Sequence, residues 1–252
     1  MLFRSNSPDI AFYEATLDLM ALQIRAKLGS SFTPAQCIQE INHFIFEELA
    51  FRFPPHSLYA KDIDVYTFIP SVMDGREGVC LGISILYLCL AQRLNLPLEI
   101  LTPPGHIYLR YHHGLELINI ETTNRGSNLP SQIYLGIDTR FIPERTIKEV
   151  VGCAFSNQAG TYLHTGKYTQ ALSCYETAKL FLPHDPQVEL LQGLCHLFLH
   201  EYRKALIYLK PLKNFCFDYA VSKETLAEDF INNDVNAEGI ETIFMPVDAS
   251  YT

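Results

Sequence analysis

Three residues of this 252-residue chain have side chains that together could perform nucleophilic chemistry: Cys80, His106 and Glu121. A cysteine supplies a thiolate nucleophile, a histidine accepts and returns a proton, and an acid holds the imidazole in one orientation. These groups are sufficient for acyl transfer through a thioester. The elements around them decide whether they can meet.

A predicted helix positions the cysteine. The two glycines of residues 74–78 indicate a turn, and the apolar run 79–91 after it predicts a buried helix from about Val79 or Cys80 to about Leu94. The start of a helix favours a thiolate, because its unpaired N–H groups and the helix dipole stabilise negative charge. Cys89 is expected to be a core residue, and a lone Cys80 would also fit a buried structural cysteine.

A predicted antiparallel meander positions the histidine and the acid. Its strands are expected at Leu98–Leu101, Ile107–Tyr111 and Leu115–Ile120. Alternation along the second strand predicts one polar face, with His106, Tyr108 and Arg110, and one apolar face.

The strand register sets the partner of His106. If His113 and Gly114 form a two-residue loop, His106 lies opposite Glu121; a one-step shift places Asn119 there instead, with Glu121 diagonal. Either Glu121 or Asn119 could therefore orient the ring. Taken singly, His106 and Glu121 also fit ordinary strand-end residues.

The segments on either side are predicted to be helical. Residues 7–28 and 33–51 have amphipathic spacing, and in the second segment Ile38, Ile41, Ile45 and Leu49 share one face. After residue 150, the pattern Tyr168-x-x-Ala171-Leu172 recurs 34 residues later as Tyr202-x-x-Ala205-Leu206, a spacing typical of paired-helix repeats. The first copy resembles the tetratricopeptide pattern more closely than the second.

The residues around Cys80 and His106 carry a family resemblance. The run EGVCLGISILYLCLAQRLNLPLEILTPPGHIYLRY, with NHFIFEELAF before it and INIETT after it, resembles the transglutaminase-like proteins of the SirB type, over about residues 35 to 210. That resemblance implies a papain-like core followed by tetratricopeptide helices. It also places Cys80, His106 and Glu121 at the nucleophile, base and acid positions, although aspartate is more usual at the third.

The charge and composition of the chain indicate which classes of binding partner to expect. The net charge is −9, and residues 218–252 hold eight acids against one lysine, so that the rest of the chain is almost neutral. With no long run of Lys or Arg, we expect no nucleic-acid partner. Seven cysteines without a CxxC pair, no apolar leader segment and no apolar run approaching 20 residues predict a cytoplasmic, non-membrane protein.

Other motifs are weaker. His196-x-x-x-His200 followed by Glu201 resembles a metal-binding helix, but HExxH is absent, so ordinary packing is the simpler interpretation. His112-His113 fits a turn. No phosphate-binding glycine motif is present, and we expect neither a cofactor nor a metal.

The sequence thus predicts an α+β protein: a papain- or transglutaminase-like domain over residues 1–150, in which a buried helix packs on a small antiparallel sheet, tetratricopeptide-like hairpins over 151–217, and an acidic segment over 218–252. Two functions follow. One is a cysteine acyl-transfer enzyme acting as thiol hydrolase, deamidase or transglutaminase. The other is a catalytically silent adaptor that binds a protein or peptide through its helical repeats. The oligomeric state is open.

Overall fold

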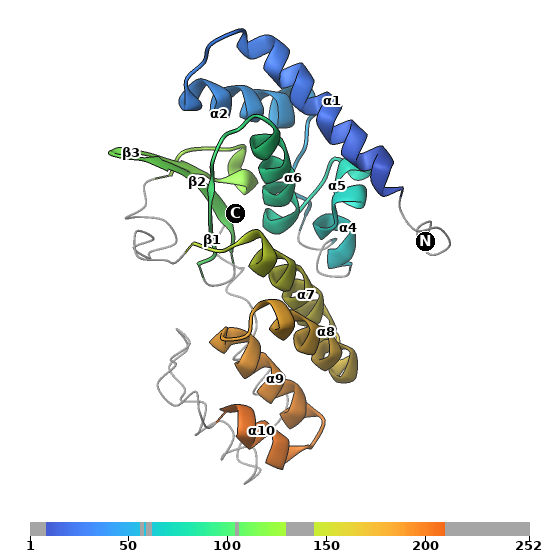
Figure 1. Ribbon diagram of the computed structural model, residues 1–252. Helices are drawn as coiled ribbons and strands as arrows, with labels where there is room; N and C mark the ends of the chain where they lie inside the picture. Colours follow the sequence, from blue (N-terminus) through green and yellow to red (C-terminus); the bar gives the residue numbers. More distant parts are fainter. Residues whose placement is uncertain (1–8, 56–57, 59–61, 104–105, 130–143, 210–252) are drawn as a thin grey trace. The chain divides into compact units, whose positions relative to one another are not determined.

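A computed structural model describes residues 9–55, 58, 62–103, 106–129 and 144–209 (Figure 1). The chain divides into two compact units, Met1–Ile147 and Lys148–Thr252. Cys80, His106 and Glu121 all belong to the first. The acidic segment 218–252 and the segment 130–143 lie outside the described residues.

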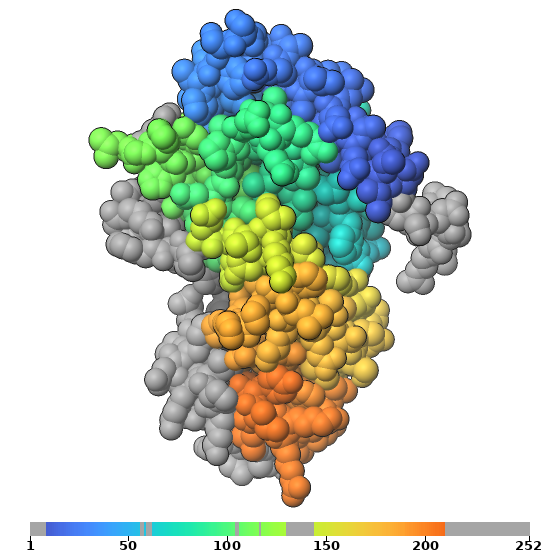
Figure 2. Space-filling model, in the orientation of Figure 1, coloured from blue at the N-terminus to red at the C-terminus, as the bar shows by residue number. Residues whose placement is uncertain are grey.

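Two long helices open the first unit. Helix α1 (Ile10–Leu28) is capped by the Asp9 carboxylate, which accepts a hydrogen bond from the Phe12 N–H. Helix α2 (Pro34–Asn42) begins with a capping box, in which Thr33 and Gln36 satisfy each other's free backbone N–H groups. The space-filling view shows α1, in the darkest blue, along the margin of this unit (Figure 2).

The second predicted helix changes geometry halfway. Residues His43–Glu48 form a π-helical turn, η1, where the sequence predicted continuous α-helix up to residue 51. Ile38, Ile41 and Ile45 are buried as predicted. Within this wider turn Phe44 and Phe46 are buried together with Ile45.

The central helix of the unit is α6 (Cys80–Arg93), and its predicted start is confirmed. It follows two short helices, α4 (Ile63–Thr67) and α5 (Ile69–Gly75). Gly82 permits a close approach to α4, because a Cβ there would lie 2.3 Å from the Tyr66 carbonyl oxygen. Only glycine fits at this point of α6.

Three strands form the predicted antiparallel meander: β1 (Glu99–Leu101), β2 (Tyr108–His113) and β3 (Glu116–Ile120), in the order β1-β2-β3. The predicted registers were wrong. His113 pairs with Glu116, so the two-residue loop is Gly114-Leu115. Gly114 has φ +60°, and a glycine with positive φ at the first loop position is typical of a type II′ turn.

The predicted division of β2 into a polar and an apolar face was also wrong. Tyr108 and Arg110, on the face expected to be polar, are buried, with 0% and 4% of their surface exposed. The Arg110 guanidinium donates hydrogen bonds to the Tyr108 hydroxyl and to the Asn119 side-chain oxygen, which lets a charged group enter the interior. His106 itself precedes the strand.

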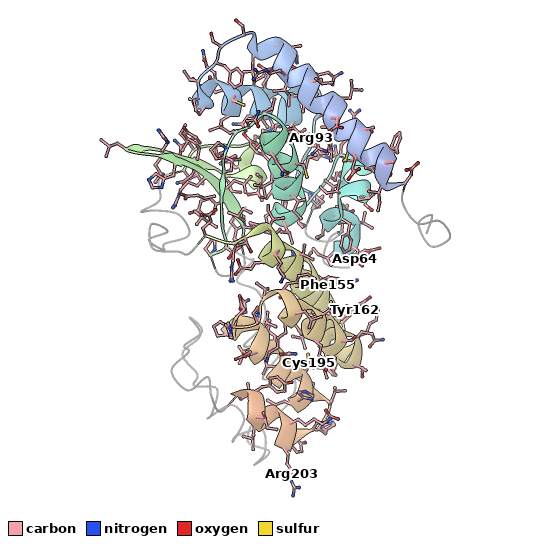
Figure 3. The ribbon with its side chains drawn as sticks, viewed as in Figure 1. Asp64, Arg93, Phe155, Tyr162, Cys195 and Arg203 are labelled. Carbon is pink, nitrogen blue, oxygen red and sulfur yellow. The ribbon has the colours of Figure 1, made fainter. Side chains whose placement is uncertain are left out.

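The second unit contains four helices within the described residues: α7 (Ile147–His164), which begins at the unit boundary, α8 (Tyr168–Phe181), α9 (Pro186–Phe198) and α10 (Tyr202–Leu209). Small residues lie between them. Ala171, Ala178 and Ala205 are fully buried, and a Cβ on Gly193 would lie 2.6 Å from Leu209. Figure 3 marks Phe155 on α7, which stacks on Phe181 at 6.1 Å between ring centroids.

No helix among the described residues is both long and apolar enough to cross a membrane.

Candidate active site

Cys80 is the first residue of α6, and neighbouring backbone fixes the start of that helix. The Gly78 N–H donates to the Arg52 carbonyl at 3.2 Å, and the Val79 N–H donates to the Tyr66 carbonyl at 2.9 Å. The thiol is partly exposed. These two backbone hydrogen bonds therefore fix the helix N-terminus at which Cys80 lies, and the sequence predicted Cys80 at that position.

His106 joins Cys80 to Glu121. The Nε2 atom of the imidazole lies 2.9 Å from a Glu121 carboxylate oxygen, Oε2, and the ring is also hydrogen-bonded to the Cys80 side chain. Since each ring nitrogen offers one in-plane hydrogen-bonding position and Nε2 faces Glu121, we expect the thiol to use Nδ1. Cys80 thus comes from the start of α6, His106 from the segment just before β2, and Glu121 from the position just after β3.

Glu121 is fixed through both oxygens. While Oε2 faces His106, Oε1 accepts hydrogen bonds from the N–H and the hydroxyl of Thr123, the first at 2.9 Å. This closes a short 3₁₀ turn, η2 (Thr122–Asn124), for which Glu121 is the N-cap. The carboxylate is 3% exposed, so its orientation is set by protein groups.

The structure distinguishes between the two candidate orienting residues. Asn119 pairs with Arg110 across the strands, accepts a hydrogen bond from its guanidinium at 2.9 Å, and donates one to the Leu129 carbonyl. Of the two, Glu121 has a described contact with the imidazole, at 2.9 Å.

The contacts of His106 and Glu121 shift both pKa values. Burial by itself would lower the pKa of His106, but the hydrogen bonds to Cys80 and Glu121 and their charges raise it from 6.5 to about 10. Burial would raise the pKa of Glu121, but His106 and the two hydrogen bonds from Thr123 lower it. At neutral pH the pair is therefore an imidazolium beside a carboxylate.

Two further contacts tie the Glu121 turn to α6 and α2. The Ser84 hydroxyl, one turn after Cys80, lies 3.0 Å from the Thr122 hydroxyl. The Tyr87 hydroxyl donates to the Asn42 side chain, which in turn donates to the Gly126 carbonyl at 3.1 Å.

The sequence analysis missed the roles of Asn42, Thr122 and Thr123. Only the position of Ser84 and Tyr87 on the helical face of Cys80 could have hinted at these ties. Gly126 has φ +73°, and a Cβ there would lie 2.1 Å from the Asn42 oxygen, so this close approach also requires glycine.

The histidines of the other two motifs contact neighbouring side chains. His196 lies 2.7 Å from Glu201, His200 lies 3.0 Å from the Tyr202 hydroxyl, and His112 lies 3.1 Å from Glu99. Among the residues that the structure describes, no group of three His, Cys, Asp or Glu side chains is arranged to hold a metal ion.

Comparisons with known proteins find two similarities in sequence. F-box only protein 21 of Mus musculus is 25% identical over 200 residues, which is 72% of this chain and 30% of that protein; its Homo sapiens counterpart is 24% identical over 230 residues, 84% of this chain and 33% of that protein. The chain spans about a third of the length of these relatives. No solved structure matches it significantly. Residues 11–135 match the profile of the transglutaminase-like superfamily. The segment that contains Cys80, His106 and Glu121 is therefore similar in sequence to the transglutaminase-like superfamily.

Proposed function

We propose that the chain is a cysteine-dependent acyl-transfer enzyme of papain-like type, with Cys80 as nucleophile, His106 as proton carrier and Glu121 as the residue that orients the imidazole. The observation that carries this proposal is the contact of one imidazole with both a helix-start cysteine and a carboxylate held on both oxygens. The PPGH sequence before β2 leads us to include the SirB-type branch in the proposal.

The reaction begins with attack of the Cys80 sulfur on the carbonyl carbon of an amide or ester. The negative charge that develops on the carbonyl oxygen is stabilised by the Cys80 backbone N–H, which has no partner within the helix at its first position. His106 donates its proton to the departing amine or alcohol. A thioester on Cys80 and a neutral imidazole remain.

The second half of the reaction frees the Cys80 sulfur and returns a proton to His106. His106 now takes a proton from water or from an amine, which attacks the thioester carbon and releases Cys80. Attack by water gives hydrolysis or, with a glutamine side chain, deamidation; attack by an amine gives cross-linking. Glu121 holds the ring orientation throughout, because Thr123 fixes its second oxygen.

An acylating reagent tests the first half of the reaction. Brief treatment with p-nitrophenyl acetate should place one acetyl group on the peptide that contains Cys80, detected by mass spectrometry, and release nitrophenol in a burst. Cys80→Ala should abolish the burst. Cys89→Ser, on the same helix, should keep it and serves as the matched control. A burst that survives Cys80→Ala would exclude Cys80 as the nucleophile.

A second function is supported by the second unit. The starts of α8 and α10, Tyr168 and Tyr202, are 34 residues apart, and each helix has a fully buried alanine three residues after its tyrosine, Ala171 and Ala205. We propose that α7–α10 are tetratricopeptide-like hairpins that bind a protein or peptide partner. If the chain is only an adaptor, Cys80→Ala should bind that partner with unchanged affinity and Cys80 should fail the acetylation test.

A further inference from the structure

Helix α1 carries apolar residues on two opposite sides. One side faces the core of its unit, where Leu17, Met20, Ala21 and Ile24 are buried. The other side bears Phe12, Leu19 and Leu22, whose surfaces are 59%, 56% and 65% exposed. A surface helix normally has a polar outer face, so this second apolar side requires an explanation.

The exposed side has the spacing of a coiled-coil seam. With the exposed residues Ala15 and Ala26 included, it consists of positions 12, 15, 19, 22 and 26, which alternate steps of three and four. In heptad terms, Phe12, Leu19 and Ala26 are a positions and Ala15 and Leu22 are d positions. At about 100° per residue, this seam lies roughly opposite the buried side.

We propose that this seam is a homodimer interface, in which α1 packs antiparallel against α1 of a second copy of the chain. This inference goes beyond the proposed function and does not depend on it. Around a two-fold axis the same seam meets itself, with a positions of one helix against d positions of the other. Leu19 then packs on the partner copy's Leu22 at the centre, with Ala15 against Ala26 on either side.

The charged residues beside the seam indicate that a second copy of α1 binds there, and in which register. In antiparallel pairing the g positions of the two helices face each other, and here they are Asp18 and Arg25, both exposed. The register centred between Leu19 and Leu22 sets Asp18 of each copy against Arg25 of the other. A slip by one heptad would set Asp18 against Asp18. The helix is therefore complementary to itself in the register with the longest apolar contact.

Asp18 can take part in this contact although Arg93 of α6 lies 2.6 Å from one of its oxygens. Its side chain is still 64% exposed, and a carboxylate accepts several hydrogen bonds. Figure 3 marks Arg93 where α6 passes α1. The pair with Arg93 holds Asp18 in place on the outer edge of α1.

Sedimentation of the whole chain from about 1 to 300 μM tests the proposal. One helix pair is a small interface, so we expect a reversible dimer with a dissociation constant of ~10–100 μM. Leu22→Glu should leave a monomer over this whole range. Leu180→Glu, a matched change of a 74% exposed leucine on α8, should leave the dimer intact.

A charge exchange then tests the register. Arg25→Glu should weaken the dimer about tenfold, because both symmetric ion pairs become repulsive. Asp18→Lys combined with Arg25→Glu should restore part of the affinity, because the exchanged charges attract again across the seam while the lysine loses the pair with Arg93. The melting temperature of each variant reports whether the fold is intact.

Three outcomes would overturn the proposal. A wild-type chain that stays monomeric at 300 μM would assign the seam to another segment or another protein. A dimer that survives Leu22→Glu would place the interface elsewhere. A dimer that is lost with Leu22→Glu but is indifferent to both charge variants would exclude the antiparallel register.

Discussion

Two of the histidine–glutamate pairs that the structure describes have similar geometry but different surroundings. In the first unit His106 lies 2.9 Å from Glu121; in the second, His196 lies 2.7 Å from Glu201. Each pair also has a cysteine nearby, Cys80 in space and Cys195 in sequence. Residue types and distance alone therefore do not distinguish a candidate catalytic pair from a structural one.

The surroundings of the two histidine–glutamate pairs differ. Glu121 is buried, and its second oxygen is bound by Thr123, whereas Glu201 is partly exposed and its second oxygen binds the side chain of Lys204 at 3.0 Å. The His196 ring stacks on Tyr208 at 5.3 Å between centroids, which uses its face for packing.

The two cysteines differ as well. Cys80 is partly exposed at a helix start and touches His106, whereas Cys195 lies inside α9 with none of its surface exposed, and burial raises the pKa of its thiol to about 12. Nucleophilic chemistry needs an accessible thiol beside the imidazole as well as the carboxylate behind it.

The largest expected effect is on thiol labelling. Limiting iodoacetamide at pH 7, followed by mass mapping, should alkylate Cys80 at least ~1000-fold faster than Cys195, because Cys80 is partly exposed beside the His106 ring, whereas Cys195 is fully buried and burial raises the pKa of its thiol to about 12. Cys89 provides a second internal reference on α6, since burial raises its pKa. Faster labelling of Cys89 or Cys195 would contradict the assignment of Cys80.

Equivalent changes in the two histidines sharpen the contrast. His106→Gln should slow alkylation of Cys80 at pH 7 about 100-fold, since the thiol loses the cation beside it. His196→Gln should leave that rate unchanged. Equal effects of the two variants would show that the response reflects general stability, so both melting temperatures should be measured alongside.

The raised pKa of His106 also predicts a pH-dependent contribution to stability. Because its folded pKa is about 10 and its ordinary value is 6.5, this contribution is fully present below about pH 6.5 and is lost as the pH rises towards 10. The cost of His106→Gln in urea unfolding should therefore fall by about 1–2 kcal/mol between pH 6 and pH 9.5.

The contribution of Glu121 to stability has the opposite dependence on pH. Its pKa is lowered, so its contribution is present above its ordinary value of 4.5 and is lost as the pH falls through the folded pKa. The cost of Glu121→Gln should accordingly decrease in acid. A cost of His106→Gln that grew in alkali would contradict the ion pair.

The smallest effect is expected at Thr123. Thr123→Val removes the hydroxyl that Glu121 accepts and should reduce the alkylation rate of Cys80 several-fold, corresponding to about 1 kcal/mol. Thr123→Ser keeps the hydroxyl and should restore most of the rate. If Thr123→Val alkylates at the parent rate, the Thr123 hydroxyl does not position the carboxylate.

The sequence predicted the elements of the site well because their signals are local. The glycine turn before Val79 and the apolar run after it predicted the start of α6. Turn residues predicted three separate strands, although His112 and His113, expected in the turn, belong to β2. The His106–Glu121 contact was also anticipated, although from registers that were wrong. The true register differs from the first predicted one by two residues, which leaves every side chain on the same face of the sheet.

What sequence reasoning could not predict depends on long-range packing. Arg110 was expected on a polar face, but Tyr108 and Asn119 satisfy its guanidinium in the interior. The π-helical turn at His43–Glu48 has no distinctive sequence signal. The choice of Glu121 over Asn119 came from the chain leaving the sheet after Ile120 and closing η2 around the carboxylate.

The tie from Asn42 to Gly126 has a consequence for how far the domain can be shortened. The last residue of α2 accepts a hydrogen bond from Tyr87 and binds the end of the turn that begins with Glu121. A fragment that began after α2 would keep Cys80, His106 and Glu121 and yet leave one end of that turn without its anchor. A fragment that keeps this anchor on a complete α2 must therefore start at or before Pro34, more than forty positions before Cys80.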